Sequence, residues 1–349
     1  MNSLDRVHTV IRGGIPDKVP IALHNFLLAA KMARIPMSQA FQDGGLLAET
    51  QLFAWRRFRH DMLMVENGTT AMAQAMGCEI AYSDHHPPYV VTPVIRNWSD
   101  IDNLTVPDPA TTFPLNCLLK ATRILKAEIG GHGFVQARSD QAPLALASAL
   151  CGYQEFFMHL ADDDNFVHIN RLTAICEKAI RRLSLALRDA GADGTCIGEL
   201  GPATISPRLY RLLAVPYLQK YFQAMRDVGF TSALHQCGDV ATTLDDTVHA
   251  GQQIIELDPV TDMTKAKSAA KGSVTILGMI DPANVLHRGT PDLIETKCRE
   301  AIAVVGAGGG FIMGPGCALS EDTPLENVAA LIAARDKYGV YGPDGVAKP

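Results

Sequence analysis

The sequence has no long apolar run and no leader-like segment at its start. No stretch approaches the roughly 18 consecutive apolar residues that a membrane-spanning helix needs. The best candidate, residues 142–150, is interrupted by Pro143 and Ser148. The first 18 residues lack the apolar segment of a signal peptide. We therefore expect no membrane association and a cytoplasmic location.

Positive charge and cysteine are also scarce. Lys and Arg total 31 against 37 Asp and Glu, which gives a formal net charge of −6 over 349 residues. A surface of that sign repels a phosphate backbone, so we expect no nucleic-acid partner. Eight scattered cysteines are too dilute for a disulfide framework. Because 47% of the residues are hydrophobic and only 19% are charged, the chain can bury a sizeable core.

Short apolar or β-branched runs alternate with segments of helical periodicity. Eight such runs predict strands, at residues 19–23, 61–65, 133–138, 194–199, 230–235, 253–257, 274–279 and 310–313. Apolar spacing of three and four from Phe166 predicts the clearest helix, and Thr323 is expected to cap the last one, with Pro324 in its first position. Eight strand–helix units predict an α/β fold, a single (β/α)8 TIM barrel over residues 1–349.

One segment departs from the alternation, and one architecture competes with the barrel. Residues 78–115, which contain several prolines, predict a β-hairpin-like insertion after the second strand. An open doubly wound sheet is disfavoured because no glycine-rich phosphate fingerprint follows an early strand. The one glycine cluster, residues 306–310, precedes a predicted strand, so we interpret it as a tight turn.

In a (β/α)8 barrel the catalytic groups lie at the carboxyl ends of the strands and in the loops that follow. The polar residues at those positions are Asn25, Glu66, Asn67, Arg138, Ser139, Asp140, Glu199, His235, Cys237, Asp239, Asp258, Asp281, Asn284 and Cys317. We expect the active site to be built from this ring.

Three members of the ring predict a metal site. His235 and Cys237 are two residues apart, so an imidazole and a thiolate can face one cation, and Gly238 lets the loop turn. Cys317 comes 80 residues later, after the eighth predicted strand, and barrel closure brings it to the same mouth. Two sulfurs and one nitrogen with an open fourth position are typical of catalytic zinc. Chance proximity of a His and a Cys is the alternative.

Ordered segments over residues 133–335 match a known pattern. They are Pro143–Ser148, Gly191–Asp193, Ile205–Pro207, Pro216–Tyr217, His235–Gly238, Leu277–Gly278 with Asp281–Pro282, Gly289–Pro291, and Gly316–Cys317 followed by Thr323–Asn327. In these segments the chain resembles the uroporphyrinogen decarboxylase superfamily, in its branch of methylcobalamin:coenzyme M and related corrinoid methyltransferases. The resemblance implies a (β/α)8 barrel whose H-x-C…C zinc motif falls on His235, Cys237 and Cys317.

The resemblance also implies a function. By this resemblance the protein is expected to be a zinc-dependent methyltransferase. Such an enzyme moves a methyl group between a corrinoid, methyl-Co(III) or Co(I), and a thiol or other small-molecule substrate. The expected partners are a corrinoid protein, which carries the methylcobalamin-type co-substrate, and a small thiol or methylated compound. We predict Glu199 or Asp239 as the acidic group that completes the Zn2+ site or orients His235.

Arg138 is the predicted clamp for an anionic group of the acceptor or the methyl donor. For each of these residues a structural role is the alternative. Arg138 would form an ion pair with Asp140 or Glu199, Glu199 would pair with a nearby arginine, and Asp239 would only shape the turn beside Gly238.

Two other functions stay open at this point. The decarboxylase branch carries an N-terminal arginine-rich motif for porphyrin carboxylates, whereas residues 21–30 here contain no arginine. That absence disfavours a uroporphyrinogen-decarboxylase-like decarboxylase or lyase that acts on a small carboxylated substrate. A non-catalytic corrinoid-binding protein is disfavoured because the chain lacks that module's D-x-H-x-x-G motif.

Overall fold

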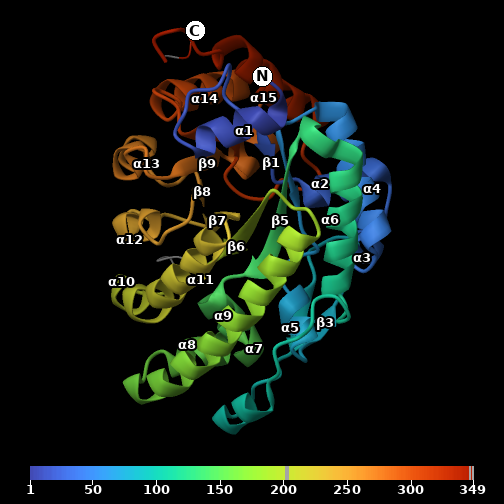
Figure 1. Cartoon of the computed structure of the whole chain (residues 1–349), viewed down its shortest axis with the longest axis vertical. Helices are drawn as coiled ribbons and strands as arrows, with labels where there is room; N and C mark the ends of the chain where they lie inside the picture. Colours follow the sequence, from blue (N-terminus) through green and yellow to red (C-terminus); the bar gives the residue numbers. More distant parts are fainter. Residues whose placement is uncertain (201–203, 346, 348–349) are drawn as a thin grey trace.

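Parallel strands form the central sheet of the computed structural model, which describes residues 1–200, 204–345 and 347. Within that part of the chain the eight strands are β1 (Ala22–Leu23), β2 (Met62–Val65), β5 (Phe134–Gln141), β6 (Gly194–Gly198), β7 (Thr231–Gln236), β8 (Ile254–Leu257), β9 (Thr275–Ile280) and β10 (Phe311–Pro315). They pair in this order, and a parallel bridge between Ile21 and Met313 links the last strand to the first. The (β/α)8 barrel and its eight predicted strands are therefore confirmed (Figure 1).

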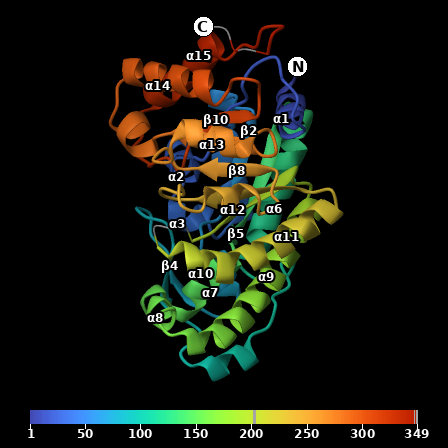
Figure 2. The same ribbon diagram turned by 90° about the vertical axis from the view of Figure 1, so that its left-hand side faces the viewer.

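Helices surround the strands. They are α1 (Ser3–Ile11), α2 (Phe26–Ala33), α3 (Met37–Ala40), α4 (Gly44–Phe58), α5 (Ala71–Ala75), α6 (Leu115–Ile129), α7 (Pro143–Cys151), α8 (Tyr153–His159), α9 (Phe166–Asp189), α10 (Pro207–Leu209), α11 (Val215–Asp227), α12 (Leu244–Val248), α13 (Met263–Ala270), α14 (Pro291–Val304) and α15 (Leu325–Tyr338). Figures 1 and 2 place both termini at one end of the molecule, near α1 and α15, and α8 at the other. In the described part of the chain, no helix has the length and apolar character needed to cross a bilayer.

The helix α9 shows how the sequence determines the packing. Its buried apolar side chains recur every three or four residues, at Ile169, Leu172, Cys176, Ile180, Leu183 and Leu187. This face packs against β5 and β6. Fully burying one such aliphatic side chain contributes about 1.5–3 kcal/mol before the loss of conformational entropy is counted. The predicted helix from Phe166 is thus stabilised by the barrel it covers.

Between β2 and β5 the chain leaves the barrel. It passes through α5, the antiparallel pair β3 (Glu79–Ala81) and β4 (Tyr89–Thr92), the 3-10 helix η1 (Trp98–Asn103) and α6. The pair β3–β4 is a sheet separate from the barrel, and it lies where the hairpin-like segment is predicted. That residues 78–115 are an insertion, and that the chain is a single domain, stay predictions.

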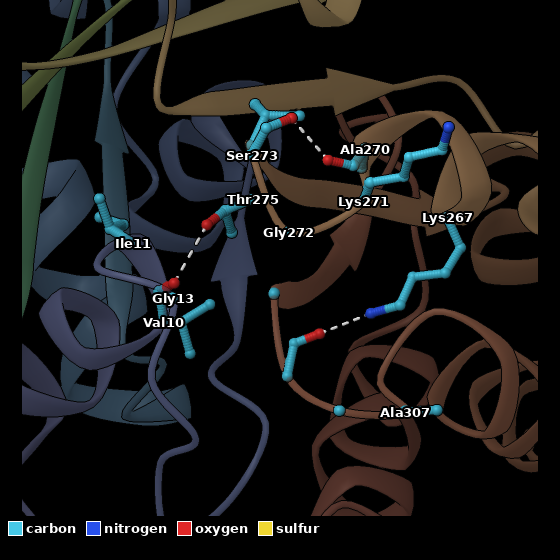
Figure 3. A pocket seen from close by; sticks show the side chains of 14 residues that line it. Val10, Ile11, Gly13, Lys267, Ala270, Lys271, Gly272, Ser273, Thr275 and Ala307 are labelled. Carbon is cyan, nitrogen blue, oxygen red and sulfur yellow. Dashed lines mark hydrogen bonds between the residues drawn. The ribbon is translucent and has the colours of Figure 1, made fainter.

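The glycine cluster lies at the amino-terminal end of the barrel, directly before β10. Gly308, Gly309 and Gly310 have φ values of +71°, +82° and +71°, which glycine adopts without strain, so the cluster is the predicted turn. It lines a cleft of about 230 Å3 (Figure 3). There the Lys267 ammonium donates a hydrogen bond to the Gly309 carbonyl at 2.7 Å, while Lys271 points away.

Candidate metal centre

Three side chains with metal-binding atoms meet at the carboxyl end of the barrel. His235 lies in β7, Cys237 follows that strand directly, and Cys317 follows β10. His235 Nε2 lies 3.0 Å from Cys237 Sγ and 3.7 Å from Cys317 Sγ, and the two sulfurs are 3.7 Å apart. The structure therefore brings together the three residues that the sequence predicts as metal ligands.

The spacing of these atoms fits a tetrahedral zinc ion. With Zn–S bonds of about 2.3 Å and Zn–N bonds of about 2.0–2.1 Å, two tetrahedral ligand atoms lie roughly 3.6–3.8 Å apart. Two of the three separations, both 3.7 Å, match this range, and the His235–Cys237 pair is closer. Both thiols are free, since a disulfide needs a sulfur separation of about 2.05 Å. Thiolates with an imidazole favour zinc over the harder cations magnesium and calcium.

Two glycines set the backbone beside the two thiols of the candidate centre. Gly238 has a φ of +81°, which turns the loop directly after Cys237, and its N–H donates to Asp258 Oδ2 at 3.1 Å. A Cβ atom at Gly316 would lie 2.6 Å from the carbonyl oxygen of Leu257. Glycine at this position therefore lets the chain before Cys317 approach the end of β8.

The two thiols differ in acidity. The hydrogen bond with Cys317 lowers the pKa of Cys237, although burial opposes it. The same contact, together with burial, raises the pKa of Cys317 to about 12. Without a cation, Cys237 is therefore the thiol that ionises first, and a bound cation would have to stabilise both as thiolates.

The acidic partner of His235 is Glu256. Its Oε2 lies 3.1 Å from His235 Nδ1, while its Oε1 accepts a hydrogen bond from His24 Nδ1 at 2.9 Å. Burial disfavours the charged imidazole, but the Glu256 carboxylate raises the pKa of His235 to about 10. A carboxylate behind the ring fixes its orientation and leaves Nε2 facing the sulfurs. The prediction that Glu199 or Asp239 orients His235 is therefore corrected, since Glu256 holds that place.

A buried chain of alternating charges continues from Glu256. His24 Nε2 lies 3.3 Å from Glu66 Oε2, and Arg138 Nε lies 3.4 Å from the same oxygen. Burial lowers the pKa of His24, but Glu256 and then Glu66 raise it to about 9. Cationic and anionic groups thus alternate along this series of contacts, which runs Arg138, Glu66, His24, Glu256, His235. Each buried charge therefore lies beside a partner of opposite sign, as buried charges require.

Sequence reasoning missed His24 and Glu256. The sequence predicts Asn25 as the site residue after β1, whereas the structure places the neighbouring His24 beside Glu256. Glu256 lies inside β8 rather than after it, and its register partner is His235 in β7. The signal that could have found it is a lone acidic residue within a fully buried apolar strand.

The other predicted residues lie in three different environments. Glu199 is buried at the amino end of α7, where its carboxylate accepts from Ala145 N at 2.8 Å and Leu144 N at 3.3 Å, and burial raises its pKa to about 7. Asp239 is exposed and accepts a hydrogen bond from Ala241 N at 2.9 Å. This contact is the one expected if Asp239 shapes the turn beside Gly238. Arg138 is buried and contacts Glu66.

A cavity of about 400 Å3 opens beside the three side chains of the candidate metal centre. Its lining in the described part of the chain is His24, Phe26, Glu66, Thr69, Arg138, Gln141, Ala145, Gly198, Glu199, Leu200, Thr204, His235, Cys237, Gly238, Cys317 and Ala318. Arg138 and Glu199 are in this set and Asp239 is not. The site is therefore a concave pocket with a soft three-ligand group at one wall and one arginine at another.

The family model of uroporphyrinogen decarboxylase (URO-D) matches residues 2–338. The chain belongs to this family. Relatives of this URO-D chain include the methylcobamide:CoM methyltransferase MtaA of Methanosarcina barkeri, which is 28% identical over 343 residues, 95% of this chain and 97% of that protein. A uroporphyrinogen decarboxylase of Syntrophotalea carbinolica is 25% identical over 274 residues, 74% of each chain. The solved structure of a methyltransferase from Methanosarcina mazei shares the fold, with a TM-score of 0.88 at 24% identity over 97% of this chain and 99% of that one.

Proposed function

We propose that this chain transfers a methyl group between a corrinoid and a thiol or other small-molecule substrate, with Zn2+ held by His235, Cys237 and Cys317. The observation that carries the proposal is the convergence of one nitrogen and two sulfurs at the cavity wall. Relatives named methylcobamide:CoM methyltransferase support methyl transfer as the reaction class. In this proposal a corrinoid protein presents the methyl carrier, and the small molecule occupies the cavity.

The residues of the chain prepare the site for a thiol. When bound, zinc would keep a thiolate available at neutral pH, where a free thiol of pKa about 8.5 is mostly protonated. Glu256 holds His235 with Nε2 toward the sulfurs, and Asp258 holds the loop of Cys237. Phe26, Ala145 and Leu200 supply apolar wall beside the three residues.

The transfer itself is a nucleophilic displacement. The thiolate sulfur forms a bond to the methyl carbon, the cobalt–carbon bond breaks, and its electron pair stays on cobalt, so methyl-Co(III) becomes Co(I) and a thioether leaves. Of the three residues predicted as catalytic, Arg138 and Glu199 stay in the proposal because they line the cavity. Asp239 does not, because it is exposed, is absent from the described lining of the cavity, and accepts a hydrogen bond from Ala241 N in the turn.

Anaerobic spectroscopy tests the proposal. Zinc-loaded chain mixed with methylcobalamin and a thiol should convert the methyl-Co(III) spectrum to that of Co(I) and form a thioether, and removal of zinc should abolish both. Free methylcobalamin and a protein-bound corrinoid should both be offered. A zinc-replete chain that is inert with every thiol and with both corrinoid forms would contradict the proposal.

A uroporphyrinogen-decarboxylase-like lyase is the second candidate, because other relatives carry that name. Such a lyase would act on a small carboxylated substrate, and uroporphyrinogen itself has several carboxylates, whereas Arg138 is the one arginine among the described residues that line the cavity. We therefore expect no useful decarboxylation of uroporphyrinogen. Chromatographic detection of stepwise carboxylate loss, at a turnover comparable with that of a dedicated decarboxylase, would reverse the order of the two candidates.

A further inference from the structure

The cleft at the amino-terminal end of the barrel contains lysines and, in its described lining, no acidic side chain. It lies between the end of α1, the loop from α13 to β9, and the glycine turn before β10 (Figure 3). Lys267 and Lys271 are its charged lining residues, although acids outnumber bases in the whole chain by 37 to 31. The candidate metal centre lies at the opposite end of the strands. This cleft is therefore a separate place with a local excess of positive charge.

Lys267 is a half-buried cation that has no counter-ion. Its Nζ donates one hydrogen bond, to the Gly309 carbonyl at 2.7 Å, and the other two donors of the ammonium have no partner among the described residues. Burial lowers the pKa of Lys267, and no described carboxylate opposes this effect. Because a buried charge is costly unless it is paired, an anion beside this ammonium would be stabilised.

The glycine turn leaves open space beside the ammonium. A Cβ atom at Gly310 would lie 4.0 Å from Lys267 Nζ, with no other atom within 4 Å beyond the adjacent residues. A Cβ atom at Gly308 or at Gly272 would have no such neighbour at all. A ligand can therefore approach the ammonium along the turn without displacing protein atoms.

Two backbone donors of the lining are also available. The N–H groups of Gly310 and Gly272 have no hydrogen-bond partner in the part of the chain that the structure describes. Backbone N–H groups in turns of this kind form concave sites for anions. The hydrogen bond to the Gly309 carbonyl holds the ammonium in the same cleft, so the cationic group is already in place before a ligand arrives.

We propose that this cleft binds a phosphate group, as the free ion or as a small phosphate monoester, with Lys267 as its main partner. A phosphate has enough oxygens to accept from the ammonium and from a backbone N–H at once. The cleft volume of about 230 Å3 is below the about 300–1,000 Å3 of pockets for drug-sized ligands, which fits a group of few atoms. The inference is independent of the proposed function, because it concerns the other end of the barrel.

Equilibrium titration of the full chain tests this assignment. The ligands are inorganic phosphate, glycerol 3-phosphate and glycerol, and the chain is first stripped of metal so that zinc cannot hold the anion. Both phosphates should bind, whereas glycerol, which lacks the anionic group, should not. Tighter binding of the ester would identify a phosphate monoester as the ligand, and tighter binding of the ion would identify free phosphate.

Variants of two lysines in α13 locate the effect. K267M should weaken phosphate binding by at least ~10-fold, because it removes a charge-assisted hydrogen bond at a partly buried position. K267R keeps a positive charge and should lose less. K265M is the matched control, since Lys265 lies in the same helix but is exposed and outside the lining of the cleft, and it should bind phosphate as the wild type does.

Chemical labelling gives a second, local readout. Saturating phosphate should protect Lys267 from acetylation by acetic anhydride, measured by peptide mass spectrometry, and leave Lys265 as reactive as before. Equal phosphate affinity in K267M and wild type would overturn the assignment, because the anion would then bind elsewhere. Equal protection of both lysines would overturn it as well, since only a general attraction of anions would remain. A wild-type chain that binds neither phosphate would have the same consequence.

Discussion

His24 Nδ1 and Glu256 Oε1 are hydrogen-bonded at 2.9 Å in the buried wall behind the candidate metal centre. This bond occupies one carboxylate oxygen of Glu256 and leaves the other 3.1 Å from His235 Nδ1. The two residues are 232 positions apart in the sequence, and barrel closure brings them together. Because a carboxylate behind a ligating imidazole sets its orientation, we expect His24 to influence the candidate metal centre through Glu256.

Substitutions at His24 should therefore change zinc affinity according to which nitrogen they replace. In His24→Asn the amide nitrogen lies near the position of Nδ1, so it can still donate to Glu256, and zinc affinity should stay within a few-fold of wild type. His24→Leu removes the donor and should weaken zinc binding by roughly 10–100-fold. Competition with a chromophoric chelator measures both dissociation constants.

His24→Gln is the matched control for this prediction. Its amide nitrogen reaches the position of Nε2, which faces Glu66 at 3.3 Å rather than Glu256. It should therefore bind zinc as weakly as His24→Leu. Equal affinity in the Asn, Gln and Leu variants would show that the contact with Glu256 does not position His235.

Zinc content should separate the ligand cysteines from the core cysteines. The wild-type chain should bind about one zinc ion, because two thiolates and one imidazole form a three-ligand site. His235→Ala, Cys237→Ala and Cys317→Ala should each lose it. Cys176→Ala and Cys298→Ala should retain it, since these thiols are buried in α9 and α14. Elemental analysis measures the zinc content of each variant. Equal zinc content in all five variants would contradict the metal assignment.

The sequence predicts the features that depend on local patterns. Buried β-branched runs such as Ile254–Ile255 give the strands, and the spacing after Phe166 gives α9. Features that depend on contacts with other parts of the chain are harder to predict from the sequence. Thr323 was expected to cap the last helix, but α15 begins at Leu325 with Pro324 at the cap and no side-chain cap bond.

The candidate site divides in the same way. His235, Cys237 and Cys317 were predicted as metal ligands because they stand at the carboxyl ends of predicted strands or in the loops that follow, where a barrel places its catalytic groups. Glu256 was missed because its role comes from pairing with His235 across two strands, which a position within one strand does not reveal. The direction of Arg138, toward Glu66 and the cavity, likewise depends on where Asp140 and Glu199 find their partners.

Acid should destabilise the fold through His60, between α4 and β2. The residue is 1% exposed, and neither ring nitrogen has a hydrogen-bond partner among the described residues. Burial lowers its pKa from 6.5 to about 4, so the folded state favours the neutral ring. The contribution of the neutral His60 ring to the free energy of unfolding is therefore complete above pH 6.5. It is lost as the pH falls toward 4, by about 1.4 kcal/mol per pH unit.

Urea unfolding of His60→Met at pH 7 and pH 5 measures this contribution. The variant cannot gain a proton at position 60, so its free energy of unfolding should fall less between the two pH values than that of wild type. His132→Met, at an exposed position, is the control and should follow wild type. The same loss in wild type and His60→Met would assign the acid sensitivity to other groups.

Substitution of Asp61 should strongly lower stability, because this carboxylate joins α1 and α15 to the barrel. Its Oδ1 accepts from Arg6 in α1 at 2.5 Å, and its Oδ2 accepts from Arg335 in α15 at 2.8 Å and from Ile21 N at 2.8 Å. All three charged side chains are buried, and the pKa of Asp61 is lowered by Arg335 against the effect of burial.

Asp61→Asn leaves two buried guanidinium groups without their shared counter-ion. The free energy of unfolding should therefore fall by about 3–5 kcal/mol, as it does when one partner of a buried ion pair is removed. Asp336→Asn is the matched control, since Asp336 also pairs with Arg335 but its side chain is 50% exposed. An exposed pair contributes about 0–1 kcal/mol. If urea unfolding gave the two variants equal stability, the carboxylate of Asp61 would not be what holds α1 and α15 against the amino-terminal end of the barrel.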